Sequence, residues 1–368
     1  MKNLLVISPV LVCFLLLLAV SPFASAAPPV LRLAGSFMQY QEEMKTWPPA
    51  VWRQILDEYS PPRVGVAEAW VMPGRSARYV RPDELHQAFN FDFLQTPWDC
   101  AALVDVIEAS LREARGVGAT ATWVLSNHDV TRPVTRYGRA DTSFSFEGRR
   151  AGTPTDLARG TRRARAAALL SMALPGSLYV YQGEELGLPE VEDIPAERRH
   201  DPMWFRSGGL DPGRDGCRVP LPWAGSRPPY GFSAAGTTTP WLEQPGDWAP
   251  LTVEAQSGAP ESMLELYRAG LHARRSAPWG DGAELEWQPS IPDVLAFRRG
   301  ERFVCLVNFG PDPVKLPAGA DVLIASNELE GGAVPHDTTV WLRQAEVRPA
   351  RPSRTETSND SGQGKEGR

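Results

Sequence analysis

Two acidic residues follow apolar runs of the sequence and could form a catalytic pair. Glu68 directly follows the run RVGVA, and Asp129 closes the triplet Asn127-His128-Asp129 behind the run TWVLS. A carboxylate at the end of a buried strand destabilises the fold unless it has a partner or a chemical role. A carboxyl group with a raised pKa beside an ionised one is the minimum machinery of glycoside hydrolysis. We therefore expect Glu68 and Asp129 to be catalytic.

Polar and aromatic residues near this pair have the chemistry to hold a sugar. Amide, imidazole and guanidinium groups bind vicinal hydroxyls, and an indole ring can stack on a pyranose. The alternative is a helix cap followed by a solvated arginine pair. A buried strand that runs directly into the polar triplet favours a site instead. The expected substrate-binding residues are His128, Asn127, Arg132, Arg136 and Trp70.

The elements that must position these residues alternate between strands and helices. Strands are expected at residues 64–67, 88–95, 121–129 and 176–187, with helical spacing at 41–59, 103–111, 157–174 and 263–271. This alternation predicts βαβ units and a parallel sheet. Three of the four strands end in polar residues, as the strands of a (β/α)₈ barrel do at their catalytic face. Four units make only half of such a barrel, and we place it at residues 52–277.

The chain after the last of these strands changes character twice. Residues 188–260 are rich in Pro, Gly and Trp, and their aromatic side chains favour a wall around a ligand over disorder. Residues 278–343 read as a small all-β domain, with a hairpin turned at RRGE and two further strands in DVLIAS and TTVWLR. Residues 344–368 are polar and poor in aromatics, which predicts a disordered tail.

The N-terminus has the layout of a secretory signal peptide. Lys2 precedes an apolar run at residues 4–20, and Ala24-Ser25-Ala26 offers a cleavage site, so we expect residues 1–26 to be removed and the protein to be secreted. A membrane anchor is the alternative, since the run is near the lower length limit for one. Residues 27–51 form a leader without an assigned structure. The remaining cysteines Cys100, Cys217 and Cys305 read as buried thiols, which is more typical of a cytoplasmic protein.

Composition and net charge limit the kinds of molecule that we expect this protein to bind. The 368 residues carry a mild net charge of −6 and no basic stripe, which argues against nucleic-acid binding. We expect no stable membrane span, no cofactor and no metal, and a small oligosaccharide as substrate. An open half barrel would leave two strand edges unpaired, which favours self-association.

Four segments together resemble glycoside hydrolase family 13, the α-amylase family: GVAEAWV, LSNHDVTRPVTRYG, PGSLYVYQGEELGL and GRDGCRVPLPW. The last segment is similar to the α-glucosidase and oligo-1,6-glucosidase branch, and the body of the chain resembles cytoplasmic bacterial enzymes. The resemblance runs from about Trp52 to Arg343. It implies that Glu68 is the general acid/base, that Asp129 stabilises the transition state and that His128 contacts substrate hydroxyls. It also implies a partial TIM-type barrel followed by a small β sandwich.

The sequence departs from this family in one important respect. The family's nucleophile lies in a Gly-Phe-Arg-x-Asp segment, and no such segment is present; the Arg-x-Asp triplets beginning at Arg81 and Arg139 follow no apolar strand. The family's Asp-x-x-x-x-Asn-His motif and acidic calcium loop are also missing. We therefore expect a truncated retaining α-glucosidase without its nucleophile. The alternatives are an inactive carbohydrate-binding or interaction protein and an anchored ectodomain, and a wrongly joined gene model would explain the missing half.

Overall fold

The computed structural model describes residues 49–146, 148–234, 240–276, 279, 284–289 and 291–344. The expected signal peptide, nearly all of the leader and the expected tail lie outside these residues. The helical elements are α1 (Pro49–Asp57), η1 (Ser76–Val80), α2 (Phe91–Gln95), α3 (Cys100–Gly116), α4 (Pro133–Gly138), α5 (Leu157–Ala173), η2 (Ala196–Arg198), α6 (Pro202–Arg206), η3 (Asp215–Cys217), η4 (Ala249–Leu251), α7 (Val253–Gln256) and α8 (Met263–Arg275). The strands are β1 (Val66–Ala67), β2 (Gln87–Ala88), β3 (Thr122–Val124), β4 (Ser177–Tyr179), β5 (Leu285–Trp287), β6 (Val294–Arg299), β7 (Phe303–Asn308), β8 (Val314–Lys315), β9 (Asp321–Ala325), β10 (Ala333–Val334) and β11 (Thr338–Arg343).

The first four strands form two short parallel pairs. β1 pairs with β2 and β3 pairs with β4, over two and three residues respectively. We expected one continuous four-stranded sheet, and no backbone ladder joins the pairs within the described residues. Side chains connect them instead, because the Thr122 hydroxyl donates to the Ala88 carbonyl (2.5 Å) and the Asn90 amide donates to the Thr122 carbonyl (3.1 Å).

The strand expected at residues 88–95 is wrong beyond Ala88. Asn90 caps the short helix α2, since its side-chain oxygen accepts a hydrogen bond from the Phe93 N–H at 2.9 Å. An Asn cap outweighs the alternating pattern that suggested a strand. The helix still buries Phe91, Phe93 and Leu94, so the apolar residues of the run serve the core in a different geometry.

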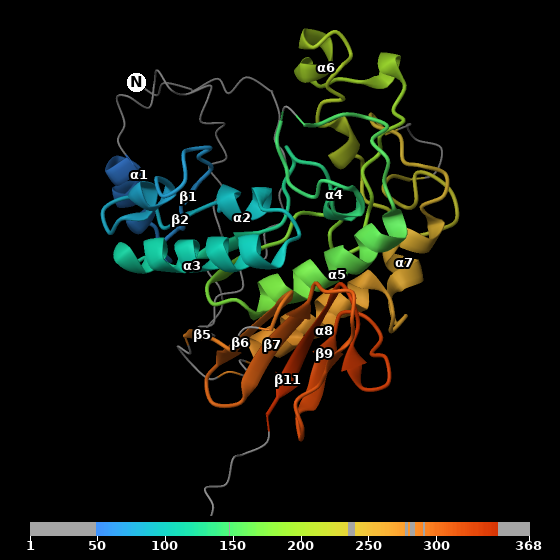
Figure 1. Ribbon diagram of the computed structural model, residues 1–368. Coiled ribbons are helices and arrows are strands. Elements are labelled where there is room, and N and C mark those ends of the chain that lie inside the picture. The colour runs from blue at the N-terminus through green and yellow to red at the C-terminus, as the bar shows by residue number, and fades with distance from the viewer. Residues whose placement is uncertain are drawn as a thin grey trace, which may run out of the picture.

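Helix α5 is the central element of the core (Figure 1). It begins at the Asp156 cap, whose side chain accepts from the Arg159 N–H, and its alanine-rich body is buried over most of its length. Gly160 lets α4 approach closely, because a Cβ there would lie 1.9 Å from the Val134 carbonyl oxygen. The other face of α5 packs on the C-terminal sheet, where the Trp341 indole donates to the Leu169 carbonyl at 3.1 Å.

The C-terminal residues form a five-stranded antiparallel sheet in the order β5-β6-β7-β11-β9, with a separate pair β8–β10. The expected hairpin is present as β6 and β7, paired from Val294 with Asn308 to Arg299 with Phe303. One face contributes Phe297, Phe303 and Trp341 to the core shared with α5. The strands at DVLIAS and TTVWLR are β9 and β11, whereas β5, β8 and β10 were not expected.

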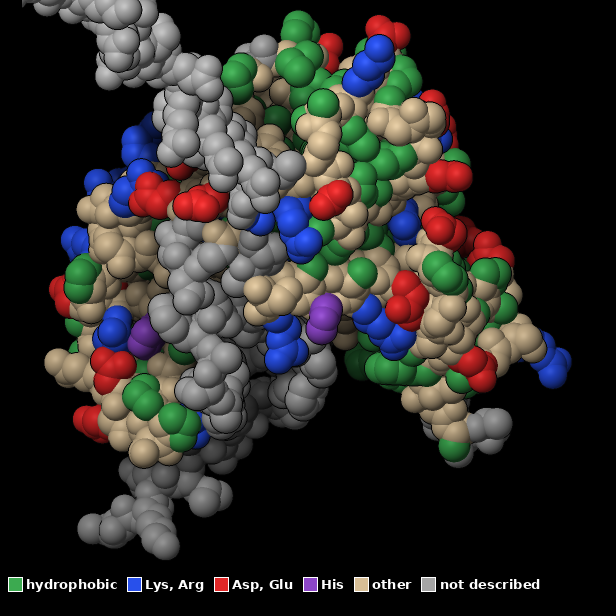
Figure 2. Space-filling view, turned by 90° about the horizontal axis from the view of Figure 1, so that it is seen from below, with side chains coloured by type: hydrophobic (Ala, Val, Ile, Leu, Met, Phe, Trp, Pro, Cys, Tyr) green, Lys and Arg blue, Asp and Glu red, His purple; other side chains and the backbone are tan. Residues whose placement is uncertain are grey.

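The long segment between β4 and α8 is ordered around buried side chains. Leu188, Val219, Tyr230 and Trp248 pack together in a cluster of their own. None of the helices that the structure describes is long and apolar enough to cross a membrane. Where described residues form the face shown in Figure 2, basic and acidic side chains are interspersed and form no continuous basic patch.

Candidate active site

Glu68 follows strand β1 by one residue and is only partly exposed. The pKa of its carboxyl group is raised from 4.5 to about 7, because burial and the charge of Asp129 raise it by more than Arg214 and Arg218 lower it. A carboxyl group with a pKa near neutrality can both give and accept a proton at pH 7. Its electrostatic environment therefore suits a general acid/base.

The triplet Asn127-His128-Asp129 follows β3 as the sequence indicated. The Asn127 side-chain oxygen accepts from the Asp129 N–H (2.8 Å), which fixes the turn behind the strand. Asn127 is 2% exposed, and its side-chain nitrogen has no hydrogen-bond partner among the described residues. Burial lowers the pKa of His128, while the charge of Asp129 raises it, so the imidazole is neutral at pH 7.

Glu68, His128 and Asp129 meet at one place. One ligand-type atom from each lies within 4.8 Å of the others, and His128 Nε2 is 3.4 Å from Asp129 Oδ1. Three such atoms could hold a metal ion. Two guanidinium groups bind the same Asp129 oxygen, however, and their charge disfavours a cation there. The geometry fits a pair of carboxyl groups, one of them held by two arginines, better than a metal centre.

Sequence reasoning missed the arginines that hold Asp129. Arg214 Nη1 donates to Asp129 Oδ1 at 3.0 Å and Arg218 Nη2 donates to the same oxygen at 2.7 Å. Arg218 Nε also donates to the His128 carbonyl at 2.9 Å. Arg214 is held in turn by Asp201, which is 2% exposed and accepts from its Nε at 2.5 Å. Both arginines lie in GRDGCRVPLPW, where their spacing of four was the available signal.

Arg132 and Arg136 are not brought into this cluster. Both are almost fully buried, at 1% and 2% exposure, so the alternative of a solvated arginine pair is wrong. The Arg132 guanidinium donates to the carbonyls of Gln182 (2.9 Å) and Cys217 (2.7 Å). The Arg136 guanidinium donates to the Leu125 carbonyl (2.9 Å) and the Thr142 carbonyl (3.2 Å). Through these hydrogen bonds the two guanidinium groups connect the loops that follow the strands.

Trp70 lies beside aromatic residues rather than alone. Its ring stacks on Phe91 with centroids 3.7 Å apart and meets Phe146 edge-on at 5.0 Å. Because Phe91 of α2 covers only one face of the indole, the Trp70 side chain remains partly exposed. Trp70 is thus part of a three-ring wall close in sequence to Glu68.

A buried acid lies directly behind the triplet. Glu184, at 6% exposure, accepts from the Ser126 hydroxyl at 2.5 Å and from the Tyr267 hydroxyl at 3.4 Å. Burial raises the pKa of Glu184 from 4.5 to about 8. The carboxyl group therefore links the ends of β3 and β4 to α8 in its neutral form at pH 7.

Comparison with known proteins identifies relatives of this chain. The family model described as alpha amylase, catalytic domain, matches residues 36–279. A probable alpha-glucosidase of Rhizobium meliloti (strain 1021) is 33% identical over 233 residues, which cover 62% of this chain and 38% of that protein. An oligo-1,6-glucosidase of Heyndrickxia coagulans is 26% identical over 301 residues, 71% of this chain and 50% of that protein. The chain thus spans half or less of the length of these two relatives.

The fold of this chain is also similar to solved enzyme structures. The alpha-glucosyl transfer enzyme XgtA matches with a TM-score of 0.64 and 28% identity, covering 80% of this chain and 54% of that one. The isomaltulose synthase SmuA from Protaminobacter rubrum matches with a TM-score of 0.62, covering 82% of this chain and 59% of that one. At 20% identity the second likeness concerns the fold alone. These matches place the chain in the TIM-barrel class.

Proposed function

Because this chain belongs to the α-amylase family of glycoside hydrolases, we propose that its site derives from an α-glucosidase. The substrate class is the terminal α-linked glucose of short oligosaccharides, and the reaction class is hydrolysis with retention. One observation carries this assignment: the Glu68 carboxyl, with its pKa near 7, lies within 4.8 Å of a carboxylate held by two arginines. Such a pair of unlike carboxyl groups is what glycoside hydrolysis requires.

Each member of the cluster has a distinct role in this proposal. Glu68 gives its proton to the leaving oxygen and later takes one from water. Arg214 and Arg218 hold the Asp129 carboxylate by hydrogen bonds, and its charge stabilises the oxocarbenium-like transition state. The neutral His128 binds a sugar hydroxyl, and Asn127 has a free amide nitrogen to do the same. Arg132 and Arg136 position the loops, and Trp70 contributes to the wall.

Retaining chemistry also needs a nucleophile, and we propose that this chain lacks one. In the part of the chain that the structure describes, no third carboxylate joins the 4.8 Å cluster. Asp129 is poorly suited to attack, because two guanidinium groups draw charge from its Oδ1. Loss of one member of a catalytic unit commonly lowers kcat by about four to six orders of magnitude. We therefore expect no measurable turnover by this chain.

Two parallel strand pairs and coverage of about half of its relatives support a partial barrel. We propose a half barrel at residues 52–277 and a C-terminal β sandwich domain at residues 278–343. The exposed strand edges of such an arrangement favour self-association, which light scattering would detect as a dimer or larger species. We further propose secretion through a signal peptide at residues 1–26, which N-terminal sequencing would support by finding Ala27 first.

A second function is favoured by the same missing nucleophile. A protein that has no nucleophile but keeps Asn127, His128 and the Asp129 carboxylate could bind an oligosaccharide and release it unchanged. Arg214 and Arg218 hold that carboxylate. The chain would then be a carbohydrate-binding or interaction protein on a glycosidase scaffold. The discriminating quantity is binding of isomaltose in the absence of hydrolysis.

The experiment combines turnover and binding. p-Nitrophenyl α-glucoside and isomaltose are offered to the full chain, to Glu68→Gln and to the matched surface variant Glu58→Gln, and isomaltose binding is measured by calorimetry. We expect no hydrolysis by any of the three. Hydrolysis by the parent and Glu58→Gln that disappears in Glu68→Gln would overturn the missing nucleophile and leave a working enzyme. Absence of both hydrolysis and binding would overturn the sugar site itself.

A further inference from the structure

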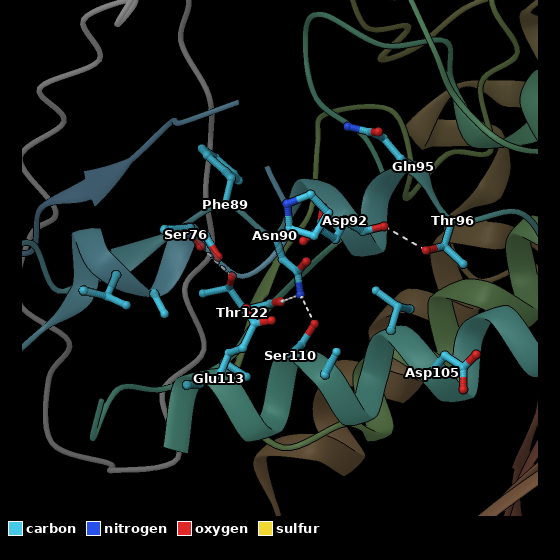
Figure 3. A pocket seen from close by; sticks show the side chains of 18 of the residues that line it. Ser76, Phe89, Asn90, Asp92, Gln95, Thr96, Asp105, Ser110, Glu113 and Thr122 are labelled. Atoms are coloured by element: carbon cyan, nitrogen blue, oxygen red, sulfur yellow. Dashed lines mark hydrogen bonds between the residues drawn. The ribbon is translucent and has the colours of Figure 1, made fainter. Parts of the chain in front are cut away.

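A cavity of about 490 Å³ lies at the other end of β3 from the candidate active site. Its walls come from η1, the residues around β2, helix α2 and one face of α3 (Figure 3). Thr120 to Thr122 line it as the chain enters β3, whereas Asn127 to Asp129 follow where the chain leaves that strand. A volume of this size is within the range that holds small ligands in proteins. The role proposed for the active site makes no use of it.

The cavity is lined by carboxyl groups, and none of the described residues in its walls is basic. Asp92 comes from the first turn of α2, and Asp105 and Glu113 come from α3. None of the three side chains forms an ion pair or a hydrogen bond among the described residues. Burial raises the pKa of Asp92, and burial together with the charge of Asp92 raises the pKa of Glu113, which its neighbour Arg112 lowers in part. The half-buried Asp92 and Glu113 and the exposed Asp105 therefore concentrate negative charge at the cavity, of which Arg112 offsets a part.

The walls are held in place before any ligand binds. The Asn90 amide donates to the Ser110 hydroxyl at 2.8 Å and to the Thr122 carbonyl at 3.1 Å, which ties α2, α3 and β3 together (Figure 3). Gly74, with a φ of +76°, brings the preceding turn against Glu113, since a Cβ there would lie 3.4 Å from Glu113 Oε1. The donors of Asn90 are used by these bonds, and the hydroxyls of Thr96 and Thr122 donate to the carbonyls of Asp92 and Ala88.

Helix α3 gives the cavity an apolar floor with acidic residues beside it. Ala102, Val106 and Ala109 line it from one helix face, and the buried Phe89, which follows β2, contributes as well. Asp105 and Glu113 lie on the same face eight residues apart, which corresponds to a rise of about 12 Å. Small apolar residues accept a methylene chain, and carboxylates at a distance from one another accept two positive groups.

We propose that this cavity binds an aliphatic polyamine, with its methylene stem along the alanine face of α3 and its ammonium groups at Asp105 and at Asp92 with Glu113. An ammonium group supplies three hydrogen-bond donors, and ionised carboxylates can only accept. It also neutralises carboxylates that lack any described partner. A neutral polyol of the same length would satisfy the acceptors but would leave the charge, and an anion would be repelled. The inference is independent of the proposed glycosidase site.

The test measures binding of spermidine to the full chain by calorimetry at low and at physiological ionic strength, with 1,8-octanediol as a neutral probe of similar length. Asp92→Asn combined with Glu113→Gln removes two charges from the cavity and keeps the side-chain shapes. Glu58→Gln combined with Glu108→Gln removes two charges from exposed positions outside it. Ala109→Leu fills the floor without changing any charge. Near-UV circular dichroism and Tm establish that each variant is folded.

We expect the parent and the Glu58/Glu108 variant to bind spermidine alike. The Asp92/Glu113 variant should bind at least tenfold more weakly, and Ala109→Leu should also weaken binding by blocking the floor. 1,8-Octanediol should not bind at matched concentration. Equal spermidine binding by the two double variants would show that only the overall negative charge attracts the amine. That result, or comparable binding of the diol, or no binding to the parent, would overturn the proposal.

Discussion

The C-terminal sheet and the strands that carry the candidate site are built in different ways. β11 pairs with β7 over six residues and with β9 over four, whereas β1 and β2 pair over two residues and β3 and β4 over three. The C-terminal sheet also packs one face on α5, with Trp341 and Phe297 fully buried between them. Its cooperativity comes from long backbone ladders and a shared core.

The strand region depends on side chains for the same purpose. The Gln87 side-chain amide nitrogen donates to the Ser177 hydroxyl at 2.7 Å, and the Tyr179 hydroxyl donates to the side-chain oxygen Oε1 of Gln87, which links β2 to β4. Asn90 and Thr122 connect β2 to β3. Each link involves one or two hydrogen bonds, so this region has less to resist local opening than the C-terminal sheet has. We therefore expect the region that carries the candidate site to open locally more often than the C-terminal sheet does.

The largest effect should follow from damage to the C-terminal core. Trp341→Ala removes a fully buried indole that contacts Phe303 and donates to Leu169. We expect the free energy of unfolding to fall by about 3–5 kcal/mol in urea denaturation. Trp241→Ala, at a position 71% exposed, is the control and should change it by no more than about 0.5 kcal/mol. Equal effects of the two substitutions would contradict the location of the core.

A smaller effect should follow from cutting the link between β2 and β4. Gln87→Ala leaves the Tyr179 and Ser177 hydroxyls without their partner, and we expect a loss of about 1–3 kcal/mol. Hydrogen exchange should become faster at the amides of β1 and β2 and stay unchanged in β7 and β11. Gln54→Ala, on the exposed side of α1, is the matched control. Faster exchange throughout the molecule would show that the two regions unfold as one.

Sequence patterns predicted elements best where local signals and tertiary packing agree. The helix at residues 157–174 and the hairpin around RRGE have strong periodicity, and both are present as α5 and as β6 with β7. The run at 88–95 misled because alternation of apolar residues does not distinguish a strand from a short capped helix. Here the Asn90 cap decided the outcome, and that cap was readable from the sequence.

The candidate site was predictable only in part for a related reason. Glu68, His128 and Asp129 could be expected together because each follows a strand of a parallel array. Arg214 and Arg218 reach Asp129 from a segment about 85 residues further along the chain, and no periodicity encodes such a contact. The hydrogen bonds of Arg132 and Arg136 also could not be predicted from the sequence. The carbonyls that accept them belong to loops whose paths depend on the whole fold.

A third prediction concerns the acid buried behind the site. Glu184 keeps its proton up to about pH 8 in the folded protein, whereas the unfolded chain releases it near pH 4.5. The folded state therefore binds more protons between these values, so its stability falls as the pH rises, by at most about 1.4 kcal/mol per pH unit.

Glu184→Gln cannot titrate and should show a shallower decline over this range in urea denaturation. The exposed variant Glu197→Gln should keep the slope of the parent. A slope unchanged by Glu184→Gln would mean that Glu184 is ionised in the folded protein and that the Ser126 and Tyr267 hydroxyls are enough to hold its charge.

The smallest effect concerns the electrostatic balance within the site. Burial and the charge of Asp129 raise the pKa of Glu68, Arg214 and Arg218 lower it, and the net result is a pKa of about 7. Arg214→Gln removes one of the two lowering charges while Arg218 continues to hold Asp129. We expect the pKa of Glu68 to move upward, because Asp129 is then less well neutralised and repels a second carboxylate more strongly.

Carbon-detected NMR titration of the Glu68 carboxyl group measures this shift directly. Arg227→Gln, an exposed arginine in the same long segment, should leave the midpoint where the parent has it. A midpoint that stayed unchanged or fell in Arg214→Gln would show that Arg214 acts on Asp201 and the loop rather than on the carboxyl pair. The hydrogen bonds from Arg214 and Arg218 to Asp129 would then stabilise the loop and would not set the pKa of Glu68.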